Sequence, residues 1–292
     1  MVAYSFQSKL IHPINKNMFR LFKTNQGIVA EKEAIFFILK NEHWDNLVNH
    51  DNLFSYLKNI DGEAIDFKNL KIAAPIDSQE IWAAGVTYFR SKKARMEESK
   101  DSGGDNFYDK VYEAERPELF FKSLPHRVAG PDEQVNIRRD ASWNVPEPEL
   151  TLFINRNKKI VGYTIGNDMS SRDIEGENPL YLPQAKTYDR SAAIGPCLLV
   201  LEKPISPDTS ISIDISRNNI TVFKDSISIS QMKRSHQELV DYLFRECDFP
   251  TGCYLMTGTG IVPPNDFTLE EKDVISISID HIGTLKNIVG KK

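Results

Sequence analysis

Three acidic residues in two neighbouring segments are spaced so that they can bind a metal ion. Glu147 and Glu149 alternate with prolines in one β-prone segment, and Asp168 ends a second. Alternate side chains of a strand point to the same face, so the two glutamates share a face. Clustered carboxylates repel one another unless they are protonated or bridged by a cation. This spacing therefore indicates a site for a hard divalent ion.

The ligand types favour one class of ion. An all-oxygen ligand set without a neighbouring His or Cys favours Mg²⁺, with Mn²⁺ or Ca²⁺ as substitutes, over zinc or copper. The alternative interpretation is an ordinary hairpin whose polar face carries solvated acids. The spacing alone does not separate the two interpretations.

A β-hairpin is expected to bring the acids together, because turn-forming residues separate the two β-prone segments. A loop at Asn155–Lys158 places Glu149 opposite Thr164. It also places Glu147 opposite Gly166, with the aspartate on the same face. Small residues beneath the acids are expected to leave room for a ligand: Gly162, Thr164 and Gly166. The other face is expected to pack in the core through Leu150, Leu152, Ile154, Val161, Tyr163 and Ile165.

Strands are predicted to dominate the chain from residue 70 onward, because short β-prone segments recur there. One polar, helix-prone stretch at 90–118 interrupts them and contains a Ser-Gly-Gly-Asp break at 102–105. We interpret this stretch as a mobile lid, with a solvated surface excursion as the alternative. A helix is predicted from His236 to Arg245, since its apolar residues have the spacing of a core-facing helix.

The first seventy residues are predicted to form a small α/β module. Strand-like stretches at Met18–Lys23 and Ala34–Leu39 precede an expected helix at Trp44–Leu57. We therefore divide the chain into residues 1–70 and a larger domain at 71–292.

Composition excludes several classes of protein. The net charge of -5 argues against a nucleic-acid partner, which requires clustered Lys and Arg. Neither an apolar run long enough to cross a bilayer nor an amino-terminal signal is visible, so we expect a cytoplasmic protein without a membrane partner. The cysteines Cys197, Cys247 and Cys253 lack the spacing of a zinc site and are expected to be buried thiols.

Several motifs resemble the fumarylacetoacetate hydrolase superfamily from about Leu70 to the carboxyl terminus. Besides the Glu-x-Glu and Asp signature, they are Gly85-Val-Thr-Tyr88, Phe120-Phe-Lys-Ser123, Gly166-Asn-Asp-Met-Ser-Ser-Arg-Asp173, Lys186, Ile194-Gly-Pro196 and Met256-Thr-Gly-Thr-Gly260. The resemblance implies an α+β, mainly β fold with a mixed β-roll core. It also implies a metal held by Glu147, Glu149 and Asp168, and a homo-oligomer, dimer or tetramer.

One departure from the superfamily pattern bears on the reaction. Members that hydrolyse carbon–carbon bonds typically carry a water-activating His and Glu where this chain has Ser91 and Ala94. Ser and Ala cannot serve as that base, so elimination is favoured over hydrolysis. Within the superfamily, the chain is most similar to members that dehydrate 3-deoxy-2-oxo sugar acids. The segments that carry this similarity are Pro146-Glu-Pro-Glu149, Asn178–Asp189 and Arg116-Pro-Glu118.

This similarity implies a magnesium-dependent hydro-lyase that acts on a small 2-oxo acid, 2-dehydro-3-deoxy-D-arabinonate, and releases 2,5-dioxopentanoate. Lys186 is the candidate base for the C3 proton, or otherwise a charge partner of the carboxylates. Glu118 is the candidate donor of a proton to the leaving hydroxyl, or otherwise a lid carboxylate. Arg90 and Thr259 are candidates for binding substrate oxygens. The alternative interpretation of Arg90 is a charged residue at the surface.

Two other functions stay open at this point. The first is a hydratase, acylpyruvate hydrolase or decarboxylase of the same superfamily that acts on an oxo-dicarboxylic acid. The second is a non-catalytic metal-binding relative that keeps the fold. Retention of Lys186 beside all three acids argues against the second.

Overall fold

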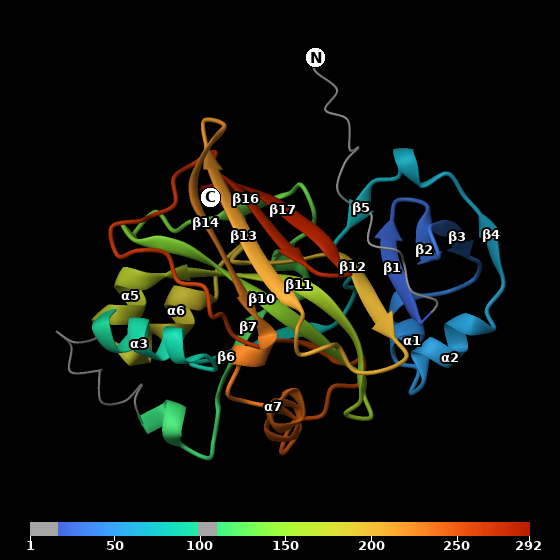
Figure 1. Cartoon of the computed structure of the whole chain (residues 1–292), viewed down its shortest axis with the longest axis horizontal. Coiled ribbons are helices and arrows are strands. Elements are labelled where there is room, and N and C mark those ends of the chain that lie inside the picture. The colour runs from blue at the N-terminus through green and yellow to red at the C-terminus, as the bar shows by residue number, and fades with distance from the viewer. Residues whose placement is uncertain (1–16, 99–109) are drawn as a thin grey trace.

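A large mixed sheet forms the frame of the protein in a computed structural model of the chain, which describes residues 17–98 and 110–292 (Figure 1). The sheet has twelve strands. In spatial order its main path is β4 (Gly62–Ala64), β3 (Ile35–Leu39), β2 (Gly27–Lys32), β1 (Met18–Thr24), β12 (Ala192–Leu201), β11 (Ile160–Ser171), β10 (Asn144–Ile154), β15 (Cys253–Met256), β6 (Glu80–Gly85) and β7 (Glu118–Ser123). Off this path, β5 (Ile72–Ala73) pairs with β1 and β8 (Val128–Ala129) pairs with β12.

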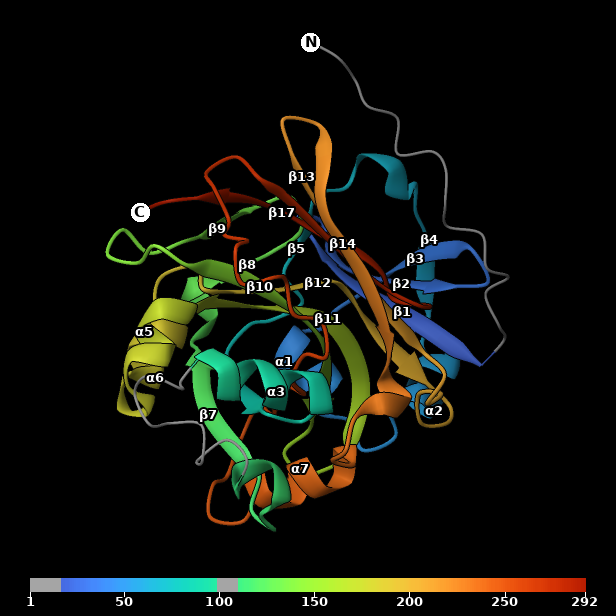
Figure 2. The same ribbon diagram turned by 60° about the vertical axis from the view of Figure 1, so that its left-hand side comes forward.

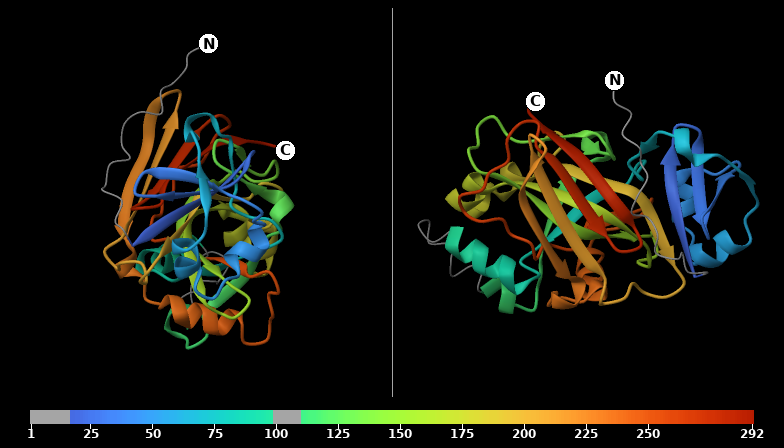
Figure 3. Two further views of the ribbon diagram at one scale, coloured as in Figure 1. Left: turned by 90° about the vertical axis from the view of Figure 1, so that its right-hand side faces the viewer. Right: turned by 45° about the horizontal axis from the view of Figure 1, so that its top comes forward.

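A second, five-stranded sheet packs across the large one (Figure 3). Its order is β14 (Ile220–Ser228), β13 (Ser210–Arg217), β16 (Val274–Ile279), β17 (Gly283–Gly290) and β9 (Gln134–Asn136). Alternate residues of β16 are buried, as expected for a strand with one face on the core. These residues share one apolar cluster with Leu150 and Ile165 of the large sheet. The predicted α+β, mainly β class is therefore confirmed.

The helices are short and lie around the sheets. They are α1 (Trp44–Val48), α2 (Leu53–Lys58), α3 (Phe89–Glu98), α5 (Arg172–Glu177), α6 (Leu182–Lys186) and α7 (His236–Leu243), with single 3₁₀ turns η1 (Phe67–Asn69), η2 (Pro125–Arg127), η3 (Pro179–Tyr181) and η4 (Ile229–Gln231). Helix α7 confirms the predicted helix, and Ser235 caps its amino terminus by accepting a hydrogen bond from Glu238 N. Figure 2 shows α3, α5 and α6 together on one side of the large sheet.

The polar stretch predicted as a lid is helical where the structure describes it. It contains α3 and a helical turn at 110–113. The Ser-Gly-Gly-Asp break lies outside the described residues, and the lid function stays a prediction.

The amino-terminal strands continue the large sheet, because β1 pairs with β12 over Met18–Leu21. The predicted helix at 44–57 is two helices, since the polar residues 49–52 end α1, and Asn52 caps α2 by accepting from Ser55 N. Strands β2 and β4 were not predicted. The division at residue 70 stays a prediction.

The hairpin that carries the acids has a different register from the predicted one. Glu147 lies opposite Asp168 and Glu149 lies opposite Gly166, a shift of two residues. The loop is one residue longer than expected, and a bulge at Phe153/Ile154 adds another residue to β11. An even shift leaves every side chain beyond the bulge on its predicted face, so the acids still share a face.

The prolines between the acids occupy the side of β10 that has no strand partner. Strand β15 pairs with β10 only from Thr151 onward. Leu150 turns its carbonyl to that side, where it accepts a hydrogen bond from Thr257 N (3.0 Å). Pro146 and Pro148 face the same way by the period of the strand, so their missing N–H groups leave no ladder bond unmade.

Two expectations about the faces of the hairpin were wrong. The small residues on the acidic face leave no room for a ligand: a Cβ on Gly166 would lie 2.3 Å from Thr151 Oγ1, and one on Gly162 would lie 2.7 Å from Leu198 Cδ1. Val161 packs with the cluster that contains Phe153 instead of with Tyr163 and Ile165, because it is the extra residue of the bulge.

The burial of the cysteines agrees with the prediction at two of the three positions. Cys197 and Cys253 are buried as expected, but Cys247 is exposed, because it follows α7 in a surface loop. Within residues 17–98 and 110–292, every helix is too short or too polar to cross a bilayer.

Candidate active site

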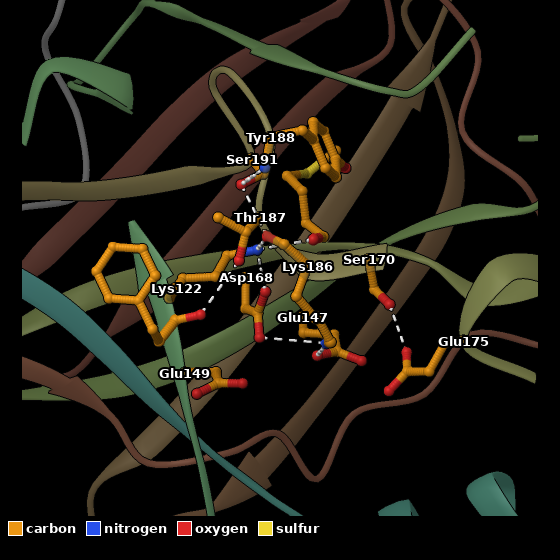
Figure 4. A network of polar contacts seen from close by, with 12 residues as sticks. Lys122, Glu147, Glu149, Asp168, Ser170, Glu175, Lys186, Thr187, Tyr188 and Ser191 are labelled. Carbon is orange, nitrogen blue, oxygen red and sulfur yellow. Dashed lines mark hydrogen bonds and ion pairs between the residues drawn. The ribbon is translucent and has the colours of Figure 1, made fainter. Parts of the chain in front are cut away.

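The three predicted metal ligands lie together and are buried. Each of Glu147, Glu149 and Asp168 offers a carboxylate oxygen, and these atoms all lie within 4.8 Å of one another (Figure 4). Cross-strand pairing brings Glu147 to Asp168, and the period of β10 adds Glu149 on the same face. Such a set of oxygen ligands suits Mg²⁺, which prefers carboxylates and water.

Three buried cations compensate the charge of the acids. Lys186 Nζ donates to Glu147 Oε2 (2.5 Å) and to Asp168 Oδ2 (3.2 Å). Lys122 Nζ lies 2.5 Å from Asp168 Oδ1. Arg172 Nη2 donates to Glu147 Oε1 (2.7 Å). Because both partners of each pair are buried, loss of one would leave an uncompensated charge in the interior.

Burial shifts the pKa values of two groups at the site, Glu149 and Lys122. Burial, and then the charges of Asp168 and Glu147, raise the pKa of Glu149 well above its ordinary value. Burial lowers the pKa of Lys122, while the Asp168 carboxylate opposes that change. A cation that binds between the acids would offset the repulsion that disfavours the ionised form of Glu149.

A peptide N–H holds Glu149 in place. Gly258 N donates to Glu149 Oε2 (2.6 Å). Gly258 has φ +94°, and a Cβ there would lie 2.0 Å from Thr87 Oγ1. A residue with a side chain would therefore be strained at this position and would clash.

One cavity joins the acids to three of the four other predicted site residues. Glu118, Lys186 and Thr259 line this cavity together with the acids. Arg90 does not line it: its guanidinium group donates to Asp225 Oδ2 (2.6 Å) and to Val262 O (3.2 Å) at the surface. Thr259 Oγ1 accepts a hydrogen bond from Ile261 N (3.2 Å), so its hydroxyl group is fixed by its own loop.

The carboxyl group of Glu118 lies over a residue without a side chain. Glu118 begins β7 and pairs with Gly85 at the end of β6. A Cβ on Gly85 would lie 2.1 Å from Glu118 Oε2 and 2.5 Å from its Cδ. The absence of a side chain at residue 85 therefore sets where this carboxyl group can lie.

Comparison with protein families identifies the fold. Residues 80–290 match the fumarylacetoacetate (FAA) hydrolase C-terminal family. The chain belongs to the fumarylacetoacetate hydrolase family. The predicted family resemblance is therefore confirmed, and it covers both strands of the acidic hairpin.

Two relatives are similar to this chain over most of their length. A protein of Haloferax volcanii described as a probable 2-keto-3-deoxyxylonate dehydratase is 47% identical over 232 residues, which cover 78% of this chain and 79% of that protein. The 2-dehydro-3-deoxy-D-arabinonate dehydratase of Saccharolobus solfataricus is 39% identical over 232 residues, 79% of this chain and 78% of that protein.

A solved structure of the same kind matches nearly the whole chain. It is 2-keto-3-deoxy-D-arabinonate dehydratase complexed with magnesium and 2,5-dioxopentanoate, which is 34% identical and has a TM-score of 0.79. The match covers 94% of this chain and 99% of that one.

The serine that the family resemblance places where hydrolytic members carry a histidine is engaged locally. Ser91 lines the cavity, and its Oγ donates to Tyr88 O (2.8 Å) within the first turn of α3. Ala94 follows in the same helix. A hydroxyl group that donates to a carbonyl has no strong basicity to activate water.

Reasoning from the sequence assigned no role to three charged residues that lie at this site: Lys122, Arg172 and Glu175. A signal for Lys122 exists, because it directly follows the apolar run Leu119-Phe-Phe in β7. Arg172 and Glu175 are buried in α5, directly after the strand that carries Asp168, and Glu175 accepts from Ser170 Oγ (2.8 Å) (Figure 4).

Proposed function

We propose that this chain is a magnesium-dependent hydro-lyase that converts 2-dehydro-3-deoxy-D-arabinonate to 2,5-dioxopentanoate and water. The observation that carries the proposal is the single cavity in which the acidic cluster meets Lys186 and Glu118. The replacement of the hydrolytic dyad by Ser91 and Ala94 favours elimination over hydrolysis. The substrate rests on the relatives, which are described as dehydratases of 3-deoxy-2-oxo pentonates.

Magnesium is the ion that fits this site, and Glu147, Glu149 and Asp168 would hold it. When bound, the ion would act as a Lewis acid toward the oxygen atoms of a 2-oxo acid. A relative of this fold has been solved with magnesium and 2,5-dioxopentanoate. The buried, all-carboxylate ligand set supports the same ion here.

In this proposal Lys186 Nζ accepts the proton that leaves C3 of the substrate. The amine lies beside Glu147 and Asp168, at the end of α6, and is buried. Lys186 also lines the cavity that the acids share, which gives its amine access to a substrate bound there.

Glu118 then gives a proton to the C4 hydroxyl group, which leaves as water. Loss of H from C3 and OH from C4 leaves a C3–C4 double bond. Two further proton transfers, from C5 to C3 and from the C5 hydroxyl group to C4, convert that enone to the aldehyde without a change in composition. The position of the Glu118 carboxyl group over Gly85, inside the cavity, supports its role as a donor.

Thr259 is proposed to bind a substrate oxygen, because it is buried at the cavity wall beside the loop that holds Glu149. The predicted role of Arg90 requires that it leave its ion pair with Asp225.

We also propose a homo-oligomer, a dimer or tetramer, which light scattering of the purified protein would test.

The test is a panel of 3-deoxy-2-oxo pentonates and hexonates, assayed with and without a chelator. We expect an aldehyde product from the arabinonate derivative, loss of activity with the chelator, and recovery with Mg²⁺. Lys186→Ala and Glu118→Gln are each expected to lower kcat by about two to four orders of magnitude.

Lys286→Ala is the control for the lysine variant, because Lys286 is exposed on β17 in the other sheet. Release of pyruvate in place of an aldehyde would contradict the proposal, as would activity that persists in the chelator.

A further inference from the structure

The segment that leads into Glu118 is fixed by a residue far away in the sequence. Residues 110–113 form a helical turn, and residues 114–117 connect it to β7. The guanidinium group of Arg234 donates to three carbonyl oxygens along this segment. The acceptors are Glu115 O (2.8 Å), Ala114 O (2.5 Å) and Val111 O (3.2 Å). Arg234 therefore satisfies the carbonyl groups at the end of the helical turn.

Arg234 is itself held in one position. Its side chain is 8% exposed, and Nη1 also donates to Glu238 Oε1 (2.6 Å), one turn into α7. Leu239, Val240 and Leu243 anchor α7 in the core. A planar guanidinium group can bond several acceptors at fixed angles, which the amine of a lysine cannot do.

Residues 232–234 also contact the residues that follow the end of β6, the strand that pairs with β7 at Glu118. Lys233 N donates to Thr87 O (2.9 Å), and Tyr88 forms an isolated β-bridge with Met232. Thr87 and Tyr88 follow Gly85, the residue that pairs with Glu118. Residues 232–234 thus bond to both sides of the Gly85–Glu118 pair. Figure 2 shows the helical turn before β7 lying beside α7.

We propose that Arg234 is a positioning residue for the reaction, which acts by fixing the place of the Glu118 carboxyl group in the cavity. The proposal rests on the proposed function, in which Glu118 donates a proton. Arg234 is outside the cavity lining and bonds to the backbone that precedes β7, so its effect on the site passes through the segment that leads into Glu118. A displacement of about 1 Å in a reacting group can lower a rate by about 100-fold.

The test is a double-mutant cycle with Arg234→Lys and Glu118→Gln. Arg234→Lys keeps the positive charge but loses the planar guanidinium group with its several fixed donors. The substitution is expected to lower kcat about 10- to 100-fold with little change in KM. In the Glu118→Gln background the same substitution should change kcat less than about twofold, because the group that it positions is already absent. Enzyme concentration is raised until the residual rate of Glu118→Gln is measured. The affinity for Mg²⁺, from titration calorimetry, should not change.

Arg217→Lys is the matched control. The guanidinium group of Arg217 also donates to a carbonyl oxygen, Thr268 O (2.9 Å), and to a carboxylate oxygen, Asp273 Oδ2 (2.8 Å), but Arg217 lies on β13 in the five-stranded sheet. Both substitutions are expected to lower the melting temperature, and only Arg234→Lys should lower kcat. Arg234→Gln serves as the second variant at the site.

The remaining outcomes overturn the proposal. They are an unchanged kcat in Arg234→Lys and Arg234→Gln, an equal loss in the two Glu118 backgrounds, and an equal loss of kcat in Arg217→Lys. A full rate for Glu118→Gln would instead remove the proposed role of Glu118 itself. An impaired Glu118→Gln beside a fully active Arg234→Lys would remove only the positioning role.

Discussion

Glu149 is placed where a negative charge is unfavourable without a bound cation. Burial and two neighbouring carboxylates raise its pKa, so the folded state holds the proton more tightly than the unfolded chain does. This group therefore opposes folding near neutral pH, and the opposition is relieved as pH falls toward the ordinary pKa of a glutamate. The residue that would help to bind the metal is a source of instability in the metal-free protein.

Glu149→Gln should stabilise the metal-free protein and remove its response to Mg²⁺. A glutamine keeps an oxygen that can accept from Gly258 N and carries no charge. In the chelator, we expect the urea midpoint of the variant to exceed that of the wild type. With Mg²⁺ at about 100 times its Kd, only the wild type should gain about 2.7 kcal/mol. A lower midpoint for the variant in the chelator would contradict this account.

Gly85→Ala is expected to move the Glu118 carboxyl group without unfolding the protein. The new Cβ would lie 2.1 Å from Glu118 Oε2, the far end of a flexible side chain, so this group must shift. We expect kcat to fall about 10- to 100-fold, as for a misplaced catalytic group, while Mg²⁺ affinity is unchanged. Stopped assays and calorimetry measure the two quantities. Unimpaired turnover would show that the position of this carboxyl group does not matter.

The site residues that the sequence pattern itself brought together are the three acids, because one local element places them, whereas Lys186, Glu118 and Thr259 came from the family resemblance. The period of a strand and its hairpin partner place Glu147, Glu149 and Asp168 together. Lys122 and Arg234 meet their partners through contacts between segments that are distant in the chain. No local periodicity encodes such contacts, so neither residue was assigned a role.

At the scale of elements, the acidic hairpin shows which part of a register can be predicted. The alternation of side chains predicted which residues share a face, and that was confirmed for the acids. The pairing itself depends on the loop length and on the bulge at Phe153/Ile154, which the sequence does not mark. Helices α5 and α6 were also missed, because each is shorter than two turns and has no apolar stripe of its own.

The loop of this hairpin is anchored by one carboxylate of the amino-terminal segment. Asp51 accepts hydrogen bonds from Asn155 Nδ2 (2.9 Å) and Asn157 Nδ2 (2.7 Å), and from Lys159 Nζ (2.9 Å). These bonds join the far end of the acidic hairpin to the region just before α2. Donors from Asn157 and then Lys159 lower the pKa of Asp51 from 3.8 to about 2.

Asp51→Asn should destabilise the protein, by an amount that depends on pH. A carboxyl group with a depressed pKa contributes stability above its ordinary pKa of 3.8, and this contribution is lost as pH falls toward 2. We expect a lower urea midpoint for the variant at pH 6 and convergence with the wild type as pH falls from 3.8 toward 2. Glu63→Gln is the control, since Glu63 bonds to the exposed Lys40 instead of to the hairpin. A difference that is constant with pH would contradict the assignment.

At the scale of the whole molecule, the strands that carry the acidic residues and the amino-terminal strands belong to one sheet. All predicted site residues lie after residue 70, yet β12, which pairs with strand β11 of the acidic hairpin, has β1 as its other neighbour. Residues of β12 such as Leu198 and Val200 also pack in one apolar cluster with Phe19 and Leu21 of β1.

A fragment of residues 71–292 is therefore expected to aggregate, although it holds every candidate site residue. Removal of β1 exposes the edge of β12 and the apolar cluster behind it, and an open apolar edge favours association. Soluble yield and light scattering test this expectation, with a fragment of residues 17–292 as the control. A monodisperse, active fragment would show that the domain division at residue 70 is an independent folding boundary.

The hydrogen bond from Gly258 N to Glu149 has a practical consequence for mutagenesis. Its donor is a peptide group, so no exchange of one side chain for another deletes it, and a scan of alanine variants would attribute any defect at residue 258 to strain at its positive φ. Replacing the amide at this residue with an ester, by chemical ligation or nonsense suppression, would remove the N–H alone and reveal how much of the cation affinity depends on the main chain.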